Sequence, residues 1–405
     1  MHDASVRASS DQVDIVIVGG GLCGSLAAAA CGREGYSTVL IDRFEVYPPD
    51  FRAEHLDGPM VEQMRRLGFL SGLTDGLPRC ETVSVARHGR MLTTMPSVNF
   101  GLRYEDLVSR ARAMVPSSVR RVTGRATEAV TGPSTQTVRL ADGRSVSGRL
   151  LVIATGHGQA LARQAGIERN MLSAGHSLTF GFDIEPAGGS LFQAGFIVYQ
   201  RESVRDRIDY LSAFTLGRTT RVNLFTYRDY KDPWTRAFID DPTNGLHAVL
   251  PRLESAIGPY RATGPVSARP MDLYVARDYR KDGVVLIGDV FQASCPATGM
   301  GIVRLLTDIE RLVTAHLPDW MRTPGMGAAK LASFYDDPVK RACDEKALHD
   351  SEYRRAVSTE LGLGWRLHRA RVAVQEQARG WFHRPVAPIV PKVPGVPPTG
   401  SLAPG

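Results

Sequence analysis

Three glycines near the start of the chain have the spacing needed to bring the backbone against a phosphate. Residues 19–24 read Gly-Gly-Gly-Leu-Cys-Gly and fit the pattern Gly-x-Gly-x-x-Gly. The first glycine permits a tight turn, the second lets the backbone approach a pyrophosphate, and the third lets a helix pack closely on a strand. A helix that begins here points free N–H groups at the phosphates. The pattern predicts a dinucleotide site with these contact residues: Gly19, Gly21, Leu22, Cys23 and Gly24.

Such a loop works only between a strand and a helix, and the flanking sequence supplies both. Residues 13–18 are β-branched and apolar, as in a parallel strand that is buried on both faces. An Ala-rich helix is predicted from about 22 to 34 and a second strand over 37–41. That strand ends in Asp42, which can accept hydrogen bonds from ribose hydroxyls, with Arg43 beside it. A tight turn without a ligand is the alternative, and the motif alone does not distinguish FAD from NAD.

A second candidate ligand site follows a later strand. Residues 283–287 predict a buried strand that runs into Gly-Asp at 288–289. The stretch 296–301 (Pro-Ala-Thr-Gly-Met-Gly) then precedes an apolar helix that carries Asp308. A helix start here again presents N–H groups and the positive end of the helix dipole to a ligand. An Asp after a strand is usually only a cap, but Pro and two Gly at these offsets predict a binding site.

Two segments of the chain resemble the aromatic-ring-hydroxylase type of FAD-dependent monooxygenases, the para-hydroxybenzoate hydroxylase family. Residues 52–69 look like its Arg-x-x-x-Leu…Glu…Leu-Gly segment, with a helix capped by Asp57. Residues 283–308 look like its Gly-Asp…Pro-x-x-Gly-x-Gly…Asp signature, with every spacing kept. The resemblance implies non-covalently bound FAD, with Arg52 near the diphosphate and Arg103 as a further contact.

The same resemblance implies roles at the flavin ring. Asp289 is expected to hydrogen-bond the ribityl chain, and the helix after residue 301 to stabilise the negative charge of reduced flavin. The residues expected against the isoalloxazine are Pro296, Gly299, Met300 and Gly301.

The sequence departs from the family pattern at three places. Gln292 stands where the family often has His, and Val303 where it often has Asn. More important, Thr155 replaces the Asp of the family's Ala-Asp-Gly, a motif associated with FAD and NADPH binding. NADPH or NADH is the expected electron donor, and reduction by a partner reductase is the alternative.

The resemblance implies oxygen transfer to a small organic substrate, with aromatic, polyketide and terpenoid compounds as candidates. Reduced flavin would react with O2 to give a flavin C4a-hydroperoxide, which passes one oxygen atom to the substrate. No catalytic acid or base is assigned, and His157 is expected to be structural. A Baeyer–Villiger insertion, an oxidase, a halogenase or reductase of the same fold, and a non-catalytic flavin-fold binding module stay open. The halogenase pattern Trp-x-Trp-x-Ile-Pro is absent, and residues 232–236 do not match it.

The 405 residues suffice for two or three domains. The expected α/β fold has an FAD-binding Rossmann-like (GR2, para-hydroxybenzoate hydroxylase-like) domain, an inserted antiparallel-sheet substrate domain and C-terminal helices. The FAD domain is predicted to be discontinuous, over 1–75, 101–172 and 275–335. Alternating apolar and polar residues predict the substrate sheet over 76–100 and 173–274. Helices are expected over 336–384 and a Pro-rich tail over 385–405, as polyproline II or as a disordered segment.

Aromatic residues of the substrate sheet are candidates for the substrate pocket, with ordinary packing as the alternative reading. They are Phe182, Tyr210, Phe225 and Tyr227.

Composition limits which binding partners and which cellular compartment are expected. The net charge is +7, yet no run of Lys and Arg is long enough to predict nucleic-acid binding. Five widely spaced cysteines without a Cys-x-x-Cys pair argue against a zinc site or a disulfide framework, so no metal is expected and the cytoplasm fits. No signal peptide or spanning segment is recognised, and a solvated face for the basic C-terminal helices is favoured over a membrane-surface helix. The expected partners are a small organic substrate and O2, and the oligomeric state is open.

Overall fold

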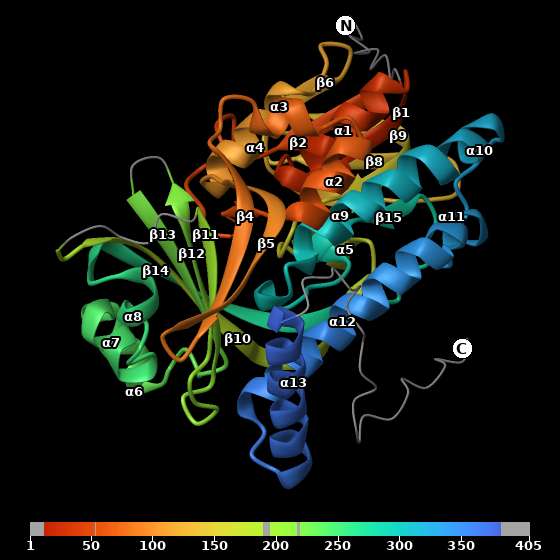
Figure 1. The fold of residues 1–405 in the computed structure, drawn as a ribbon. Helices are drawn as coiled ribbons and strands as arrows, with labels where there is room; N and C mark the ends of the chain where they lie inside the picture. The colour runs from red at the N-terminus through yellow and green to blue at the C-terminus, as the bar shows by residue number, and fades with distance from the viewer. Residues whose placement is uncertain (1–11, 53, 189–194, 217–218, 382–405) are drawn as a thin grey trace, which may run out of the picture.

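The computed structural model describes residues 12–52, 54–188, 195–216 and 219–381, and the predicted tail over 385–405 lies outside them. Two β-sheets stand side by side, each with its own helices (Figure 1). The chain passes between them several times, so each layer is assembled from segments far apart in the sequence. This arrangement confirms the predicted α/β fold class.

The first sheet has the strand order β6-β2-β1-β9-β8-β7, with β15 also paired to β9. Strands β6, β2, β1, β9 and β15 are parallel, and Ile15 lies between Thr38 and Leu150. Residues 15–18 are buried, as predicted for a strand covered on both faces. The strands span β1 (Val13–Val18), β2 (Thr38–Asp42), β6 (Arg120–Thr123), β7 (Ala126–Val130), β8 (Gln136–Leu140), β9 (Ser145–Ile153) and β15 (Val284–Leu286).

Helices cover this sheet and start where the glycine motifs predict. Helix α1 (Leu22–Arg33) follows the first motif, α9 (Met300–Glu310) follows the second, and the two helices contact each other. Helix α2 (Gly58–Arg66) begins as predicted, because the Asp57 carboxylate accepts from the Met60 amide at 3.2 Å. The remaining helices of this layer are α3 (Leu70–Thr74), α4 (Tyr104–Ala113) and α5 (Ala160–Gln164).

The second sheet has the order β14-β10-β13-β12-β11-β4-β5-β3 and is antiparallel except for the β11–β4 pair. Strands from the two predicted segments therefore meet in one sheet. Their bounds are β3 (His55–Leu56), β4 (Arg79–Arg87), β5 (Arg90–Gly101), β10 (Glu168–Pro186), β11 (Phe196–Gln200), β12 (Ile208–Leu216), β13 (Thr219–Thr226) and β14 (Tyr260–Arg277).

The two faces of the second sheet have different neighbours. One face packs against three short helices, α6 (Pro233–Asp240), α7 (Pro242–Val249) and α8 (Glu254–Ile257), through a core that includes Phe180 and Phe238. The other face is joined to the first layer, since the Tyr210 hydroxyl on β12 donates to the Ala297 carbonyl just before α9. A ligand held beside α9 therefore lies against the second face.

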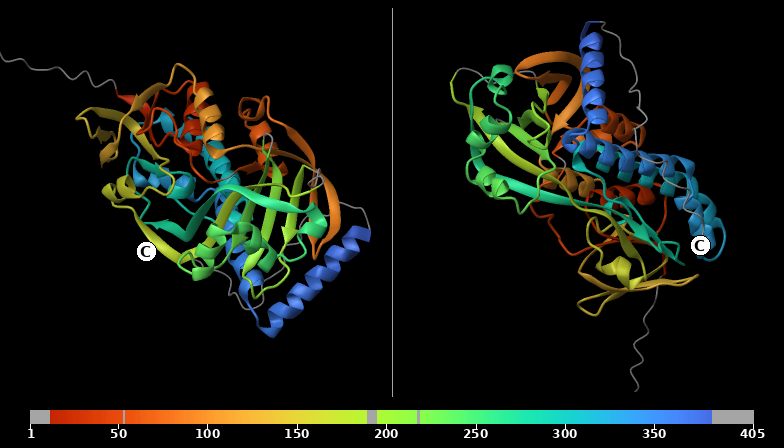
Figure 2. Two further views of the ribbon diagram at one scale, coloured as in Figure 1. Left: turned by 90° about the vertical axis from the view of Figure 1, so that its left-hand side faces the viewer. Right: turned by 90° about the horizontal axis from the view of Figure 1, so that it is seen from below.

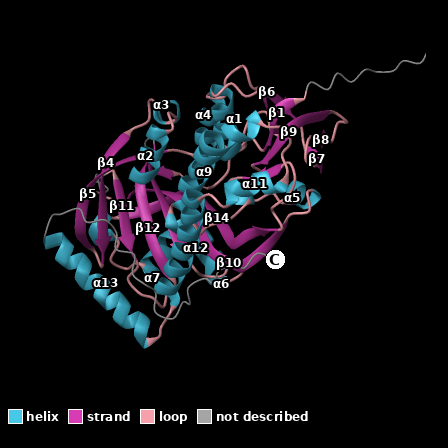
Figure 3. Cartoon of the chain, turned by 90° about the vertical axis from the view of Figure 1, so that its right-hand side faces the viewer, coloured by secondary structure: helices cyan, strands magenta, loops and turns pink. Residues whose placement is uncertain are grey.

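The C-terminal helices connect both layers. After a π-helical segment (Arg311–His316) come α10 (Leu317–Arg322), α11 (Ala328–Tyr335), α12 (Pro338–Thr359) and α13 (Leu363–Trp381). Helix α12 contacts α9 and then β12, as Figure 3 shows, and α13 contacts β5. Helix α13 stands out from the body in both views of Figure 2. Over the described residues, none of the helices is long and apolar enough to cross a membrane.

Candidate cofactor and substrate site

The first glycine loop has the geometry that its sequence predicts. Gly19 has a φ of +110°, and a Cβ there would lie 2.5 Å from the Ala154 carbonyl oxygen. A side chain on Gly24 would collide with the Gly19 carbonyl, so the helix and loop touch directly. Around Gly21 the space is open, with the nearest atom, on Tyr47, 4.0 Å from a Cβ built there. Helix α1 has neither a side-chain cap nor an acidic residue in its first turn, which leaves its N–H groups for an anion.

Asp42 and Arg112 hold this loop in shape. The Asp42 carboxylate accepts from the Gly20 amide at 2.6 Å and from the Phe44 amide at 2.7 Å. Arg112, on α4, pairs with Asp42 at 2.9 Å and donates to the Gly20 carbonyl at 2.7 Å. Arg43, in contrast, is exposed, with its guanidinium over the Phe44 ring. Sequence analysis missed Arg112, because nothing local ties residue 112 to a loop 92 residues earlier.

Arg52 joins the segment after β2 to the Gly-Asp loop. Its Nε donates to Asp50 at 2.6 Å, and its guanidinium nitrogen lies 3.6 Å from the Asp289 carboxylate. Asp50 also pairs with Arg269 of β14 at 2.8 Å. Burial alone would raise the pKa of Asp50, but the pairs with Arg52 and Arg269 outweigh it and lower the pKa. This group of charges, at the junction of both layers, brings together Arg52 and Asp289, two of the expected FAD contacts, and adds Asp50 and Arg269.

A buried network fixes the Gly-Asp loop from behind. The Gly288 amide donates to the Asp308 carboxylate at 2.8 Å, and Asp308 pairs with Lys340 of α12 at 2.6 Å. Lys340 also pairs with Asp344 at 3.0 Å, and Asp344 with Arg304 at 2.9 Å. Burial raises the pKa of Asp308, and the Lys340 ammonium opposes that shift. The position of the loop therefore depends on a lysine from the C-terminal helices.

The side of Asp289 away from this network is lined by His157 and Tyr274. The Tyr274 hydroxyl donates to the Asp289 carbonyl at 3.0 Å, and His157 lies 2.9 Å from that hydroxyl and 3.5 Å from the Asp289 carboxylate. Burial lowers the pKa of His157, which favours the neutral ring. Thr155, the departure from the family motif, donates its hydroxyl to the Gly158 carbonyl at 2.7 Å and so closes a local turn.

The loop before α9 leaves its backbone open on one side. A 3₁₀ turn over Pro296–Thr298 leads into Gly299, which has a φ of +68°, and Met300 begins the helix. The N-cap residue Gly299 has no side chain, and the first turn of α9 has no acidic residue, although the Thr298 hydroxyl accepts from the Met300 amide at 3.1 Å. A Cβ on Gly301 would meet no atom of the described chain within 4 Å. A flat ligand can therefore lie against this backbone, at the positive end of the helix.

Three of the four predicted pocket aromatics gather at this loop. Tyr210, Phe225 and Tyr227 pack with the buried Cys295 and Ala297. The Tyr210 and Phe225 rings lie 4.6 Å apart, as expected for partners across β12 and β13. Burial raises the pKa of Tyr227, so its hydroxyl stays protonated. The cluster gives the loop an apolar wall with two hydroxyl groups.

The fourth aromatic, Phe182, lies elsewhere. It packs 5.9 Å from Phe238 of α6, in the core on the far face of the sheet. Phe182 pairs with Val222, whereas Phe225 pairs with Thr179, and residues an odd number of positions apart on a strand point to opposite faces. The pocket role predicted for Phe182 is wrong for this reason.

Arg103 takes part in a buried charge cluster with Glu54, Arg221 and Asp183. Its guanidinium lies 3.2 Å from Asp183 and 3.7 Å from Glu54, while Arg221 pairs with Glu54 at 2.7 Å and with Asp183 at 3.2 Å. Burial raises the pKa of Glu54, although Arg221 opposes it. The two positive charges of the cluster compensate its two negative charges. Arg103 therefore contacts residues of the second sheet, and Glu54 and Arg221 join it as partners that could not be predicted from the sequence.

The loops and helix starts described above fit a dinucleotide cofactor. A family model described as FAD binding domain matches residues 12–315, and the chain belongs to this family. The resemblance seen in the sequence is thereby confirmed. A search of curated proteins finds no match. Among the described residues, no group of three or more His, Cys, Asp and Glu side chains is arranged to hold a metal ion.

Solved structures share the fold at low sequence identity. The p-nitrophenol 4-monooxygenase PnpA from Pseudomonas putida DLL-E4 has a TM-score of 0.69 and 16% identity, over 92% of this chain and 94% of its own. The halogenase PltM has a TM-score of 0.67 and 14% identity, over 92% and 83%. The Diels-Alderase PyrE3 of pyrroindomycin biosynthesis has a TM-score of 0.64 and 19% identity, over 91% and 77%. The fold is therefore common to several reactions, and the reaction must be argued from the site.

Proposed function

We propose that this protein is an FAD-dependent monooxygenase that inserts one oxygen atom of O2 into a small organic substrate, with NADPH or NADH as electron donor. One observation carries the proposal: the backbone at the start of α9 is open at Gly301, and the loop just before it packs against an apolar, hydroxyl-bearing wall from the second sheet. Bound FAD would supply the activation of O2 and the oxygen transfer. The protein would supply position, charge and exclusion of water.

The adenosine end of FAD would be held at the first loop. The uncapped start of α1 would bind the diphosphate, and the open space at Gly21 would let the phosphates approach. Asp42 would accept from the ribose through Oδ2, which accepts from the Gly20 amide and has a second lone pair, whereas Oδ1 already faces Phe44 and Arg112. Arg52 would add positive charge on the diphosphate side, at the junction of both layers.

The ring end would be held at the second loop. Asp289 would hydrogen-bond the ribityl chain, with Arg52 and His157 orienting its carboxylate. Gly299, Met300 and Gly301 would lie against the ring, and the α9 dipole would stabilise negative charge on the reduced flavin. The Lys340 network would keep this loop from shifting when charge develops, because Gly288 is bonded to Asp308.

The substrate would bind between this loop and the second sheet. The cluster of Tyr210, Phe225 and Tyr227 would exclude water from the reacting atoms and present hydroxyl groups. Trp234 does not contribute to this site, because it packs against Phe180 and Phe238 on the far face. This placement gives no support to a halogenase based on the segment 232–236.

Thr155 raises the question whether NADPH or NADH reduces the flavin directly, and this question can be tested. Its hydroxyl is used in the turn to Gly158, and a threonine has no carboxylate with which to replace the family's Asp. The FAD-loaded protein should be titrated anaerobically with NADPH and separately with NADH, then mixed with O2 while flavin absorbance is followed. Bleaching by either nucleotide and oxygen-dependent recovery through a transient species would support the proposal. A flavin that neither nucleotide reduces, with candidate substrates present, would overturn direct NAD(P)H dependence.

A further inference from the structure

A cavity of about 320 Å³ lies in the second sheet, beyond the aromatic cluster. It is enclosed by β3, β4 and β5 on one side and by the ends of β11 and β12 on the other. Its volume is within the range of sites that bind small organic molecules. The residues that line this cavity include His55, Thr82, Asn99, Phe100, Phe196 and Phe214.

The backbone fixes the shape of this cavity. Strand β5 ends against β12 so closely that a Cβ on Gly101 would lie 2.6 Å from the Thr215 carbonyl oxygen and 2.8 Å from the Phe214 ring. His55 stacks on Phe196 with ring centroids 3.9 Å apart and an angle of 3° between the planes. These contacts fix the positions of the strands and rings that line the cavity.

The cavity is close to the flavin loop. His55 belongs to β3, and Asp57 follows two residues later, which places their Cα atoms at most about 7 Å apart. The Asp57 carboxylate lies 3.5 Å from where a Cβ on Gly299 would be. The His55 side of the cavity is therefore connected through β3 and Asp57 to the backbone that would hold the flavin ring.

The wall combines aromatic and uncharged polar side chains, and the only permanently charged residue lining the described cavity is Arg79. Burial lowers the pKa of His55 to about 3, although a hydrogen bond with Asn99 opposes the shift, so this ring is neutral at physiological pH. Arg79, at the exposed rim, pairs with Glu81 at 3.4 Å. Glu54, next to His55, is paired with Arg221 and Arg103. An anionic or cationic ligand would lose its hydration here without gaining a counter-ion.

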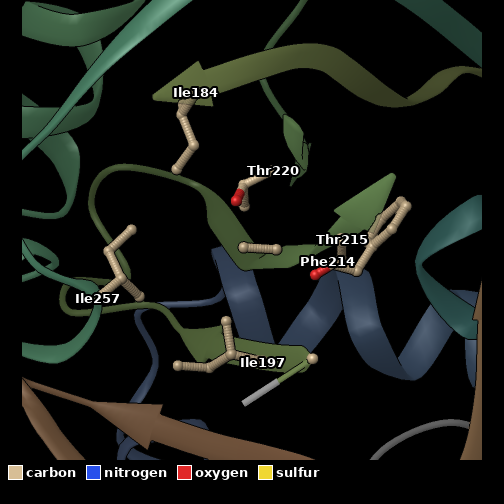
Figure 4. Close-up of a pocket in the computed structure, with 8 residues that line it drawn as sticks. Ile184, Ile197, Phe214, Thr215, Thr220 and Ile257 are labelled. Carbon is tan, nitrogen blue, oxygen red and sulfur yellow. The ribbon is translucent and has the colours of Figure 1, made fainter. Parts of the chain in front are cut away.

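A second pocket nearby is too small to bind an organic ring. It lies on the other side of β11 and β12, where Ile184, Ile197 and Ile257 line it (Figure 4). Its volume is about 10 Å³, enough for one water molecule at most. An organic ring has room only in the larger cavity of the two.

We propose that the 320 Å³ cavity binds the uncharged, ring-containing part of the substrate and so selects neutral aromatic or polycyclic compounds over carboxylates. This assignment rests on the proposed function for its link to turnover, but binding itself is measurable without any redox step. The neutral probe is 2-naphthol, and 2-naphthoate is its anionic counterpart of similar size.

The test is calorimetric titration of the FAD-loaded, full-length protein with each probe. We expect saturable 2-naphthol binding, at least tenfold weaker 2-naphthoate binding, and at least tenfold weaker 2-naphthol binding in Thr82→Trp, which fills the cavity. Arg90→Trp is the matched control, because Arg90 is exposed on the neighbouring strand β5 and is not part of the wall. It should bind 2-naphthol like the parent protein.

If Thr82→Trp does not fold, Phe196→Leu removes the stacking partner of His55 and should also weaken 2-naphthol binding. Absence of 2-naphthol binding, equal binding by the filled variant, or a preference for 2-naphthoate would overturn the assignment. Failure of NAD(P)H to reduce the flavin would leave it standing, because these binding data do not involve electron transfer.

Discussion

The two sheets differ in how their binding surfaces are made. The first sheet presents backbone: open N–H groups at α1 and α9, and glycines whose missing side chains leave room for a ligand. The second sheet presents side chains from one face, such as Tyr210 and Phe225, whose direction depends on strand pairing. Backbone sites need short sequence motifs, whereas side-chain surfaces need the correct register over many residues. Cofactor binding is accordingly easier to predict from sequence than substrate choice.

The first prediction tests whether the Gly-Asp loop depends on Lys340 of α12 for its position. Lys340→Met leaves Asp308 buried without its paired cation, although Asp344 keeps Arg304, and should destabilise the fold by about 3–5 kcal/mol. Lys346→Met, on the same helix, removes an exposed pair with Asp350 and should cost less than about 1 kcal/mol. Urea unfolding of both variants gives the comparison. Equal, small losses would show that the loop does not need the C-terminal helices.

The second prediction concerns the polar end of the second sheet. His176 is 2% exposed, and burial together with Arg355 lowers its pKa to about 4. The unfolded chain takes up this proton below about pH 6.5, so folded stability from this group is present above that pH and is lost toward pH 4. Between pH 7 and 5 the loss from His176 should be about 2 kcal/mol.

His176→Gln removes this titration, so its unfolding free energy should fall less over the same pH interval by about 2 kcal/mol. Urea unfolding of the parent and the variant at both pH values supplies the measurement. An identical pH dependence in the two proteins would mean that His176 is already accessible to protons when folded.

The third prediction separates folding from cofactor binding in the first sheet. Gly301→Val meets no protein atom within 4 Å of the new Cβ, so the apoprotein should keep its melting temperature. The side chain would instead enter the space proposed for the flavin ring and weaken FAD binding at least tenfold, or about 1.4 kcal/mol. Gly364→Val, equally open at the start of α13, is the control and should leave FAD affinity unchanged. Fluorescence titration with FAD decides between them.

The smallest predicted effect tests the contact between the two sheets. Tyr210→Phe removes the hydrogen bond to the Ala297 carbonyl and should cost about 1 kcal/mol of stability. Tyr230→Phe changes an exposed ring and should be neutral. A loss from Tyr230→Phe as large as that from Tyr210→Phe, in the same urea experiment, would argue that this contact contributes nothing specific.

The limits of sequence analysis follow from the same comparison. The strand, glycine loop and helix around residues 13–34, and the cap at Asp57, were predictable because all their partners are local. Arg112, Arg269 and Lys340 were not, since their partners lie far along the chain. Phe182 shows the remaining difficulty: the alternation of its strand is visible in the sequence, but which face meets the flavin loop is decided by packing of α6–α8. Only the folded chain fixes that choice.

The most direct test of the central claim is the flavin content of the full-length protein after incubation with FAD and removal of the excess. We expect about one FAD per chain, released by acid because it is not covalently bound, and absent from a Gly24→Val variant whose new side chain would collide with the Gly19 carbonyl. A protein that remains colourless, or a Gly24→Val variant that retains FAD as well as the parent, would contradict the assignment of this loop as the flavin site.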